Sequence, residues 1–216
     1  MNKDEFVKDI SKLGIDVDDN KINLLDRYYH FLIEWNEKIN LTAIVDEEEV
    51  YLKHFYDSLT LIKEIDLSQD ISLCDVGSGA GFPGIVIKIF FPNIRIKLID
   101  SLQKRVNYLN EIIKNLELNN ISCEHCRMED YSRLHEEEFD YITARAVANL
   151  NIISEISVRA LKINGHMVFM KGNCDEELDK FLKSINKLGL VLESNNKFKL
   201  PKEDSNRTLI NLKKVK

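Results

Sequence analysis

Four of the chain's eight glycines lie within eight residues, from Gly77 to Gly84. The window follows the apolar run 71–74 and precedes the apolar run 85–91, a pattern that predicts a strand, a glycine turn and a helix. Glycine tolerates positive φ angles and lets a ligand approach the backbone closely. The start of the helix adds N–H groups that have no partner within the helix. The sequence therefore predicts a cradle for a nucleotide-like ligand.

Strands and helices are expected to alternate after this window. The predicted strands are 71–76, 94–100, 121–126, 139–144 and 166–171, followed by a hairpin of strands near 190–199 and 207–214. The predicted helices are 83–91, 102–117 with Ser101 as its N-cap, 149–161 and 175–188. This order predicts an α/β, Rossmann-like fold, with a mostly parallel seven-stranded sheet that ends in an antiparallel hairpin.

The N-terminal third has a different pattern. Apolar residues recur at helical spacing over 21–39 and 47–64, and the polar stretch 66–70 is typical of a linker. We expect residues 1–66 to form a helical appendage and residues 67–216 to form the ligand-binding domain.

Composition limits the class of protein. With 44% hydrophobic and 31% charged residues the chain can bury a core, and no apolar run approaches the roughly 20 residues that span a bilayer. No signal peptide is recognisable, so we expect a cytoplasmic protein without membrane contact. The four cysteines include Cys123 and Cys126, but no second Cys/His pair lies at a useful spacing. We therefore expect reduced thiols and no metal.

The net charge of −6 argues against indiscriminate binding of nucleic acid. The C-terminal segment 197–216 is an exception, because it holds seven basic and two acidic residues. Two interpretations stay open for this basic tail: lysines on a solvated strand edge, or contacts to RNA.

The register of the glycines distinguishes two kinds of cofactor. Residues 79–84 match the dinucleotide pattern G-x-G-x-x-G. Read from Gly77, the first glycine after the strand, that pattern needs a glycine where Phe82 stands. Asp75 also places an acid before the loop, which suits the positive groups of S-adenosylmethionine and repels a pyrophosphate. The window is thus typical of the cofactor loop of a class I S-adenosylmethionine-dependent methyltransferase, with Gly77 and Gly79 at the cofactor.

Two later positions extend the predicted cofactor site. Asp100 ends the second strand, where a carboxylate can accept hydrogen bonds from the ribose hydroxyls; a helix cap or surface acid is the alternative. Met128 and Glu129 follow the third strand and can flank an adenine, although Glu129 can equally be a solvated residue.

The absence of two motifs limits the choice of atom that the enzyme can methylate. The three prolines are not adjacent, and no cysteine follows a proline, so the loops typical of amino-group and pyrimidine-carbon methylation are absent. Arg145 stands where cofactor and substrate should meet. Guanine N7 carries a free lone pair, so its methylation needs positioning and electrostatics but no general base. For Arg145 the structural alternative is an ion pair with Asp140 or Glu129.

The window 74–84 closely resembles the loop of the RsmG (GidB) family of bacterial 16S ribosomal RNA guanine-N7 methyltransferases. The segments 35–42, 54–59, 100–101 with 104–105, 143–148 and 170–172 resemble the same family. The resemblance implies methylation of one guanine of 16S rRNA, guanine 527 in the family's naming. It implies cofactor contacts at Gly77, Phe82, Met128-Glu129 and Arg145, with methionine where the family usually has alanine.

His54, Asp57 and Lys171 also match family signatures, and we list His54 and Lys171 with Arg145 as candidate catalytic residues. His54 can equally be a hydrogen-bonded histidine between appendage and core. Three other functions stay open: a methyltransferase for another RNA or a small molecule, a NAD-dependent oxidoreductase, and a non-catalytic RNA-binding module that uses the basic tail.

Overall fold

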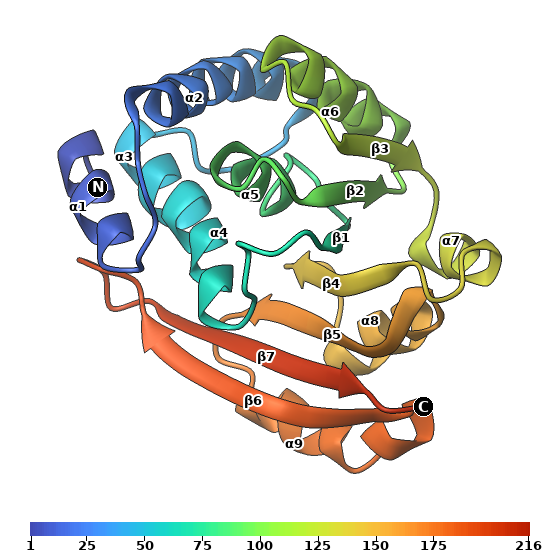
Figure 1. Cartoon of the computed structure of the whole chain (residues 1–216). Coiled ribbons are helices and arrows are strands. Elements are labelled where there is room, and N and C mark those ends of the chain that lie inside the picture. The colour runs from blue at the N-terminus through green and yellow to red at the C-terminus, as the bar shows by residue number, and fades with distance from the viewer.

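The computed structural model describes all 216 residues and is built on one seven-stranded sheet with the order β3-β2-β1-β4-β5-β7-β6 (Figure 1). Strands β1 to β5 are parallel, and β7 runs antiparallel to both β5 and β6. The predicted α/β fold and its terminal hairpin are confirmed. The strands are β1 (Ser72–Val76), β2 (Arg95–Asp100), β3 (Ile121–His125), β4 (Phe139–Arg145), β5 (Leu161–Lys171), β6 (Leu190–Lys199) and β7 (Asn206–Lys214).

Helices cover both faces of the sheet. One face carries α5 (Gly84–Phe90), α6 (Gln103–Asn115) and the N-terminal helices, and its core includes Leu73 and Leu98. The other face carries α7 (Met128–Leu134), α8 (Leu150–Ser157) and α9 (Asp175–Leu182), and its core includes the neighbouring residues Cys74 and Ile99. Short 3-10 segments follow α8 (η3, Val158–Ala160) and α9 (η4, Ile185–Leu188). Adjacent strand residues point to opposite faces, which explains why both are apolar.

The N-terminal residues form α1 (Lys3–Ser11), α2 (Asp19–Ile39) and a continuous helical run: α3 (Glu47–Val50), the π-helical η1 (Tyr51–Tyr56), α4 (Asp57–Leu59) and the 3-10 segment η2 (Thr60–Lys63). Helix α1 was not predicted. A capping box starts it, because Asn2 accepts a hydrogen bond from the Glu5 backbone and the Glu5 carboxylate accepts one from Asn2.

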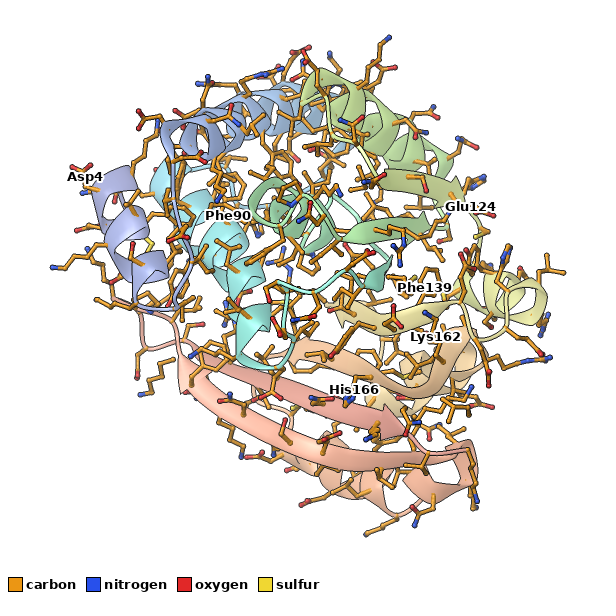
Figure 2. All side chains as sticks on the ribbon, in the orientation of Figure 1. Asp4, Phe90, Glu124, Phe139, Lys162 and His166 are labelled. Atoms are coloured by element: carbon orange, nitrogen blue, oxygen red, sulfur yellow. The ribbon has the colours of Figure 1, made fainter.

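Residues on both sides of position 66 share one hydrophobic core. Phe90 of α5 packs edge-on against Phe6 of α1, with 6.3 Å between ring centroids, and Figure 2 shows Phe90 directed into the space between α5 and the N-terminal helices. Buried residues from all N-terminal helices share this core with β1 and β2. The division into 1–66 and 67–216 stays a prediction about the chain's organisation.

Two local predictions need correction. The N-cap of α6 is Leu102 rather than Ser101, because the buried Asp100 carboxylate accepts the Leu102 N–H at 2.9 Å. Strand β5 starts at 161 rather than 166, since Leu161 pairs with Phe139 of β4 before a shift in register leads to the pair of His166 with Tyr141. Helix α7, seven residues long, was not predicted. None of the helices combines the length and apolar character needed to cross a bilayer.

The sheet order places the site. Strands β1 and β4 are neighbours, while the chain runs outward from β1 to β2 and β3 on one side and from β4 to β5 on the other. The carboxyl ends of β1 and β4 therefore flank the switch point at which parallel α/β sheets bind ligands. The glycine window follows β1 directly, and Arg145 is the last residue of β4.

Candidate functional site: a glycine loop beside a cation-lined cavity

The glycine loop adopts a backbone that other residues avoid. Gly77, Gly79 and Gly81 have φ angles of +67°, +58° and +96°. The loop is fastened to the end of β2, because the N–H groups of Gly77 and Ser78 both donate to the Ile99 carbonyl, at 2.7 and 3.2 Å. A side chain at Gly77 would stand 2.6 Å from Val147, whereas one at Gly79 would meet nothing closer than 3.8 Å. The open space of the cradle thus lies above Gly79.

Asp100 supports the loop from below. Its Oδ2 accepts the Gly79 N–H at 2.9 Å, and Arg105 Nη1 lies 3.7 Å from the same oxygen. The side chain is 2% exposed. Each carboxylate oxygen can accept further hydrogen bonds. The ribose contact of Asp100 stays a prediction, next to this observed role in bracing the loop.

Asp75 is buried beneath the loop. Its Oδ2 accepts the Gly84 N–H at 2.9 Å, and its Oδ1 has no partner. Burial raises the pKa of this carboxyl to about 7, against the opposing effect of the Gly84 hydrogen bond. A buried carboxyl oxygen without a partner, next to an open glycine cradle, fits a ligand that carries positive charge.

Gly84 packs against the sheet. A Cβ there would lie 2.8 Å from Asp75 Oδ2 and would overlap Leu98. The absence of a side chain at Gly84 therefore lets α5 pack closely against β1 and β2.

Phe82 joins the loop to the N-terminal helices. It is buried and stacks on His54 with centroids 4.4 Å apart and on Tyr28 at 5.3 Å. The Arg145 guanidinium carbon lies 5.1 Å from the Phe82 centroid. Aromatic residues from two helical segments therefore fix the position of Phe82.

Arg145 is held by residues of the helical run 47–63. Its Nη1 donates to the Lys53 carbonyl at 3.0 Å and to Asp57 Oδ2 at 3.3 Å. Asp57 also accepts a hydrogen bond from Arg207 Nε at 3.0 Å. The suggested ion-pair partners Asp140 and Glu129 are wrong: Asp140 pairs with Lys162, and Glu129 faces Arg127.

His54 is a neutral, fully hydrogen-bonded side chain. Arg145 Nη2 donates to its Nδ1 at 3.1 Å, so the ring proton is on Nε2 and is donated to Thr42 Oγ1 at 3.0 Å. Burial and the positive charge of Arg145 lower the His54 pKa to about 3. This geometry matches the histidine packed between appendage and core, and a catalytic part for His54 stays a prediction.

Beside this cluster lies a cavity of about 340 Å³ at the carboxyl ends of β4 and β5. Lys171, the last residue of β5, donates to the Ala148 carbonyl at 2.6 Å and to Glu177 Oε1 at 3.1 Å. Four cationic side chains and one carboxylate line the cavity. Its lining is Ile44, Lys53, His54, Asp57, Arg145, Ala146, Met170, Lys171, Gly172 and Arg207.

Sequence reasoning missed the place of Asp57 and Arg207 in this cluster. Arg207 lies 150 residues after Asp57 and was counted only as part of the basic tail. No local pattern connects the two positions, since the pairing arises when β7 joins the sheet beside β5.

Met128 and Glu129 begin α7 and lie at the carboxyl end of β3, on the same edge of the sheet as the glycine loop. Met128 is buried in the core of the second face, and Glu129 is partly exposed. The adenine contact of this pair stays a prediction.

Cys123 and Cys126 are free thiols. Burial raises their pKa values to about 12 and about 11, which keeps both protonated at neutral pH. No group of three or more His, Cys, Asp or Glu side chains is arranged to bind a metal ion.

Comparisons with known proteins identify the family of the chain. Residues 21–208 match the profile of the GidB family, described as rRNA small subunit methyltransferase G. The chain is 42% identical to "Ribosomal RNA small subunit methyltransferase G" of Lysinibacillus sphaericus, over 100% of this chain and 92% of that protein. It is 45% identical to the protein of the same name from Desulforamulus reducens, over 95% of this chain and 87% of the relative.

Solved structures share the fold at low sequence identity. A SAM-dependent methyltransferase from Aquifex aeolicus superimposes with a TM-score of 0.59 at 19% identity, over 85% of this chain and 98% of that one. The [4+2]-cyclase SpnF superimposes with a TM-score of 0.60 at 14% identity, over 74% of this chain and 81% of that one. The architecture is therefore that of the S-adenosylmethionine-dependent methyltransferases, and the chain belongs to the rRNA small subunit methyltransferase G family.

Proposed function

We propose that this protein transfers the methyl group of S-adenosylmethionine to N7 of guanine 527 in 16S rRNA. One observation carries the proposal: two features lie side by side at the switch point of the sheet. The first is the glycine loop, with positive φ angles and the buried Asp75 beneath it. The second is the cavity, whose lining includes the cationic side chains of Lys53, Arg145, Lys171 and Arg207. Family membership over almost the whole chain supports the same reaction.

The residues that would hold the cofactor are those of the loop and its supports. Gly79 leaves room for close approach to the backbone, Gly77 makes the turn before it with Val147 packed against it, and Asp100, Met128 and Glu129 lie on the same edge of the sheet. S-adenosylmethionine supplies an electrophilic methyl group on a sulfonium centre. The partnerless Oδ1 of Asp75 adds negative potential beneath the loop, which favours a positively charged ligand.

The cavity has the chemistry of a guanine nucleotide site. Arginine can donate two parallel hydrogen bonds to guanine O6 and N7 or to a phosphate. When N7 is the reacting atom, its lone pair must stay free, so we assign the arginines to O6 and phosphate oxygens. Methylation of N7 removes no proton at the reacting atom, and the neutral, hydrogen-bonded state of His54 is compatible with that requirement.

The decisive experiment is mass spectrometry of 16S rRNA from a strain that lacks the gene. We expect 7-methylguanosine at one position to disappear and to return with the wild-type gene. Unchanged 7-methylguanosine would refute the assignment. Purified protein should then be assayed on free 16S rRNA and on small ribosomal subunits, which determines the form of the substrate.

Calorimetry tests the rival functions. We expect binding of S-adenosylmethionine and none of NADH, whereas an oxidoreductase would bind NADH. A non-catalytic RNA-binding module predicts that no RNA is methylated and that Gly77→Asp leaves RNA affinity unchanged. Fractionation of cells tests the predicted cytoplasmic location.

A further inference from the structure

The glycine loop is attached to the N-terminal helices by one buried hydrogen bond. Tyr28 of α2 is fully buried, and its hydroxyl donates to the carbonyl of Ala80 at 2.6 Å. Ala80 lies between Gly79 and Gly81, in the middle of the loop. Burial raises the Tyr28 pKa well above its ordinary value, so the hydroxyl stays a donor throughout the physiological pH range.

The Tyr28 ring makes the second attachment. It stacks on Phe55 of η1, at 5.5 Å, and on Phe82 of the loop, at 5.3 Å, and the Phe55 and Phe82 centroids lie 6.0 Å from each other. The hydroxyl also fits closely against Gly81, where a Cβ would lie 2.7 Å from the Tyr28 oxygen. Tyr28 thus contacts three successive residues of the loop, one by hydrogen bonding, one by close backbone approach and one by stacking.

Such a support matters because Gly77, Gly79 and Gly81 have no side chains and leave the loop backbone many accessible conformations, while the proposed cofactor contact is made at this backbone. A loop that is free to relax loses affinity, since binding must then order it again. Asp100 braces the β2 side of the loop through Gly79, and nothing on the sheet reaches the Ala80 carbonyl. The Tyr28 hydroxyl therefore supplies a restraint that the sheet lacks.

We propose that Tyr28 is a positioning residue of the cofactor site, and that the N-terminal helices contribute to cofactor affinity through it. Tyr28 holds the segment Ala80 to Phe82 in its ligand-binding conformation without touching the reacting atoms. The inference concerns the cofactor loop alone, so it stands whether or not guanine N7 is the methylated atom.

Tyr28→Phe tests the proposal, and Tyr51→Phe is its matched control. Tyr51 belongs to the same helical layer, is buried, and donates from its hydroxyl to Asp26 Oδ1 at 2.5 Å. Both variants lose one hydroxyl that donates a hydrogen bond, but only Tyr28 contacts the loop. Affinity for S-adenosylmethionine is measured by calorimetry on folded protein, and stability by urea unfolding.

We expect Tyr28→Phe to raise the Kd for S-adenosylmethionine three- to tenfold and Tyr51→Phe to leave it within twofold. Amide hydrogen exchange at Gly81 and Phe82 should accelerate in Tyr28→Phe relative to amides of β4. In a methylation assay KM for the cofactor should rise while kcat is retained, whereas a purely structural loss would lower the active fraction and kcat.

The proposal is overturned if Tyr28→Phe binds the cofactor with wild-type Kd, or if both variants weaken binding equally. The proposal is also overturned if the wild-type protein does not bind S-adenosylmethionine. Failure of the guanine-N7 assignment gives a different result: normal cofactor binding in the wild-type protein, with no methyl transfer to 16S rRNA.

Discussion

Gly79→Ala tests whether the cofactor approaches the backbone of the glycine loop at Gly79. Gly79 has a φ of +58°, and a Cβ there would meet nothing closer than 3.8 Å. The substitution therefore introduces no collision in the free protein. Its effect on stability comes from the left-handed backbone, which costs an L-residue about 1–2 kcal/mol. Out of a typical stability of about 5–15 kcal/mol, that loss leaves the protein folded.

Gly14→Ala is the matched control. Gly14 has a φ of +78°, and a Cβ there meets nothing within 4 Å. It follows α1 and has no part in the cofactor loop. Both substitutions should lower the free energy of unfolding by a similar amount, about 1–2 kcal/mol in urea titrations.

The two variants should differ in cofactor binding. At Gly79 the new methyl group would enter the open part of the cradle, so we expect the Kd for S-adenosylmethionine to rise at least about tenfold, equivalent to about 1.4 kcal/mol. Gly14→Ala should retain the wild-type Kd. A wild-type Kd for Gly79→Ala would show that the cofactor does not approach Gly79, and equal weakening in both variants would show a global effect.

Three further predictions concern charged groups. Arg145→Ala should lower the rate of methyl transfer at least about tenfold, equivalent to about 1.4 kcal/mol. Urea titration should find the variant folded, because Asp57 keeps its ion pair with Arg207. Near-normal turnover would assign Arg145 to structure alone. The affinity for S-adenosylmethionine should increase as pH rises through 7, because its positive charge favours ionised Asp75, and Asp75→Asn should abolish this dependence in calorimetry. Arg207→Gln should reduce the salt slope of RNA binding by about 1, whereas Lys213→Gln should leave the slope unchanged.

The sign of the Asp75 effect on stability follows from the same shift. Its folded pKa, about 7, lies above the ordinary value of 3.8. The protonated carboxyl therefore stabilises the folded state, fully below the unfolded pKa, and this contribution is lost as pH rises through the folded pKa. Without cofactor the protein should lose unfolding free energy between pH 4 and 7, and Asp75→Asn should remove that part of the loss.

The succession of strands and helices along the chain and the glycine loop were predictable because both follow from local patterns. Apolar runs of strand length alternate with helical periodicity after residue 71, and chain connectivity then limits the sheet to few topologies. The register of the glycines was fixed by Phe82 and Asp75, two residues within the same window. Helix α7 escaped prediction because it has only seven residues, and Met128 and Glu129 were considered only as candidate adenine contacts after the third strand.

The partners of Arg145 could not be predicted. Asp57 is 88 residues away in sequence, and the approach of the two side chains depends on how the N-terminal helices pack against the sheet. The π-helical turn η1 carries His54 and precedes Asp57, so it sets where both side chains face. Periodicity predicted a helix over 47–64 but gave no signal for this local widening.

Counting charges along the sequence gave no information on how the basic tail is paired. Five of its seven basic residues are paired with acids: Lys197 with Asp175, Lys199 with Asp204, Lys202 with Glu5, Arg207 with Asp57, and Lys214 with Glu137. The tail therefore lies against acidic side chains in the folded protein, and both interpretations, a solvated strand edge and contacts to RNA, stay open. Cationic side chains also gather in the cavity beside the glycine loop.

The pairs in that cavity are suited to exchange. Lys53 pairs with Glu49, whose side chain is 50% exposed, and exposed pairs are worth only about 0–1 kcal/mol. An RNA phosphate can replace such a carboxylate at little cost in free energy. Asp57 is 5% exposed and fastened by two arginines, so it stays in place and orients both guanidinium groups. A protein of net charge −6 can thus attract one backbone segment at one cavity while the rest of its surface repels RNA, which favours a defined ribosomal target over bulk nucleic acid.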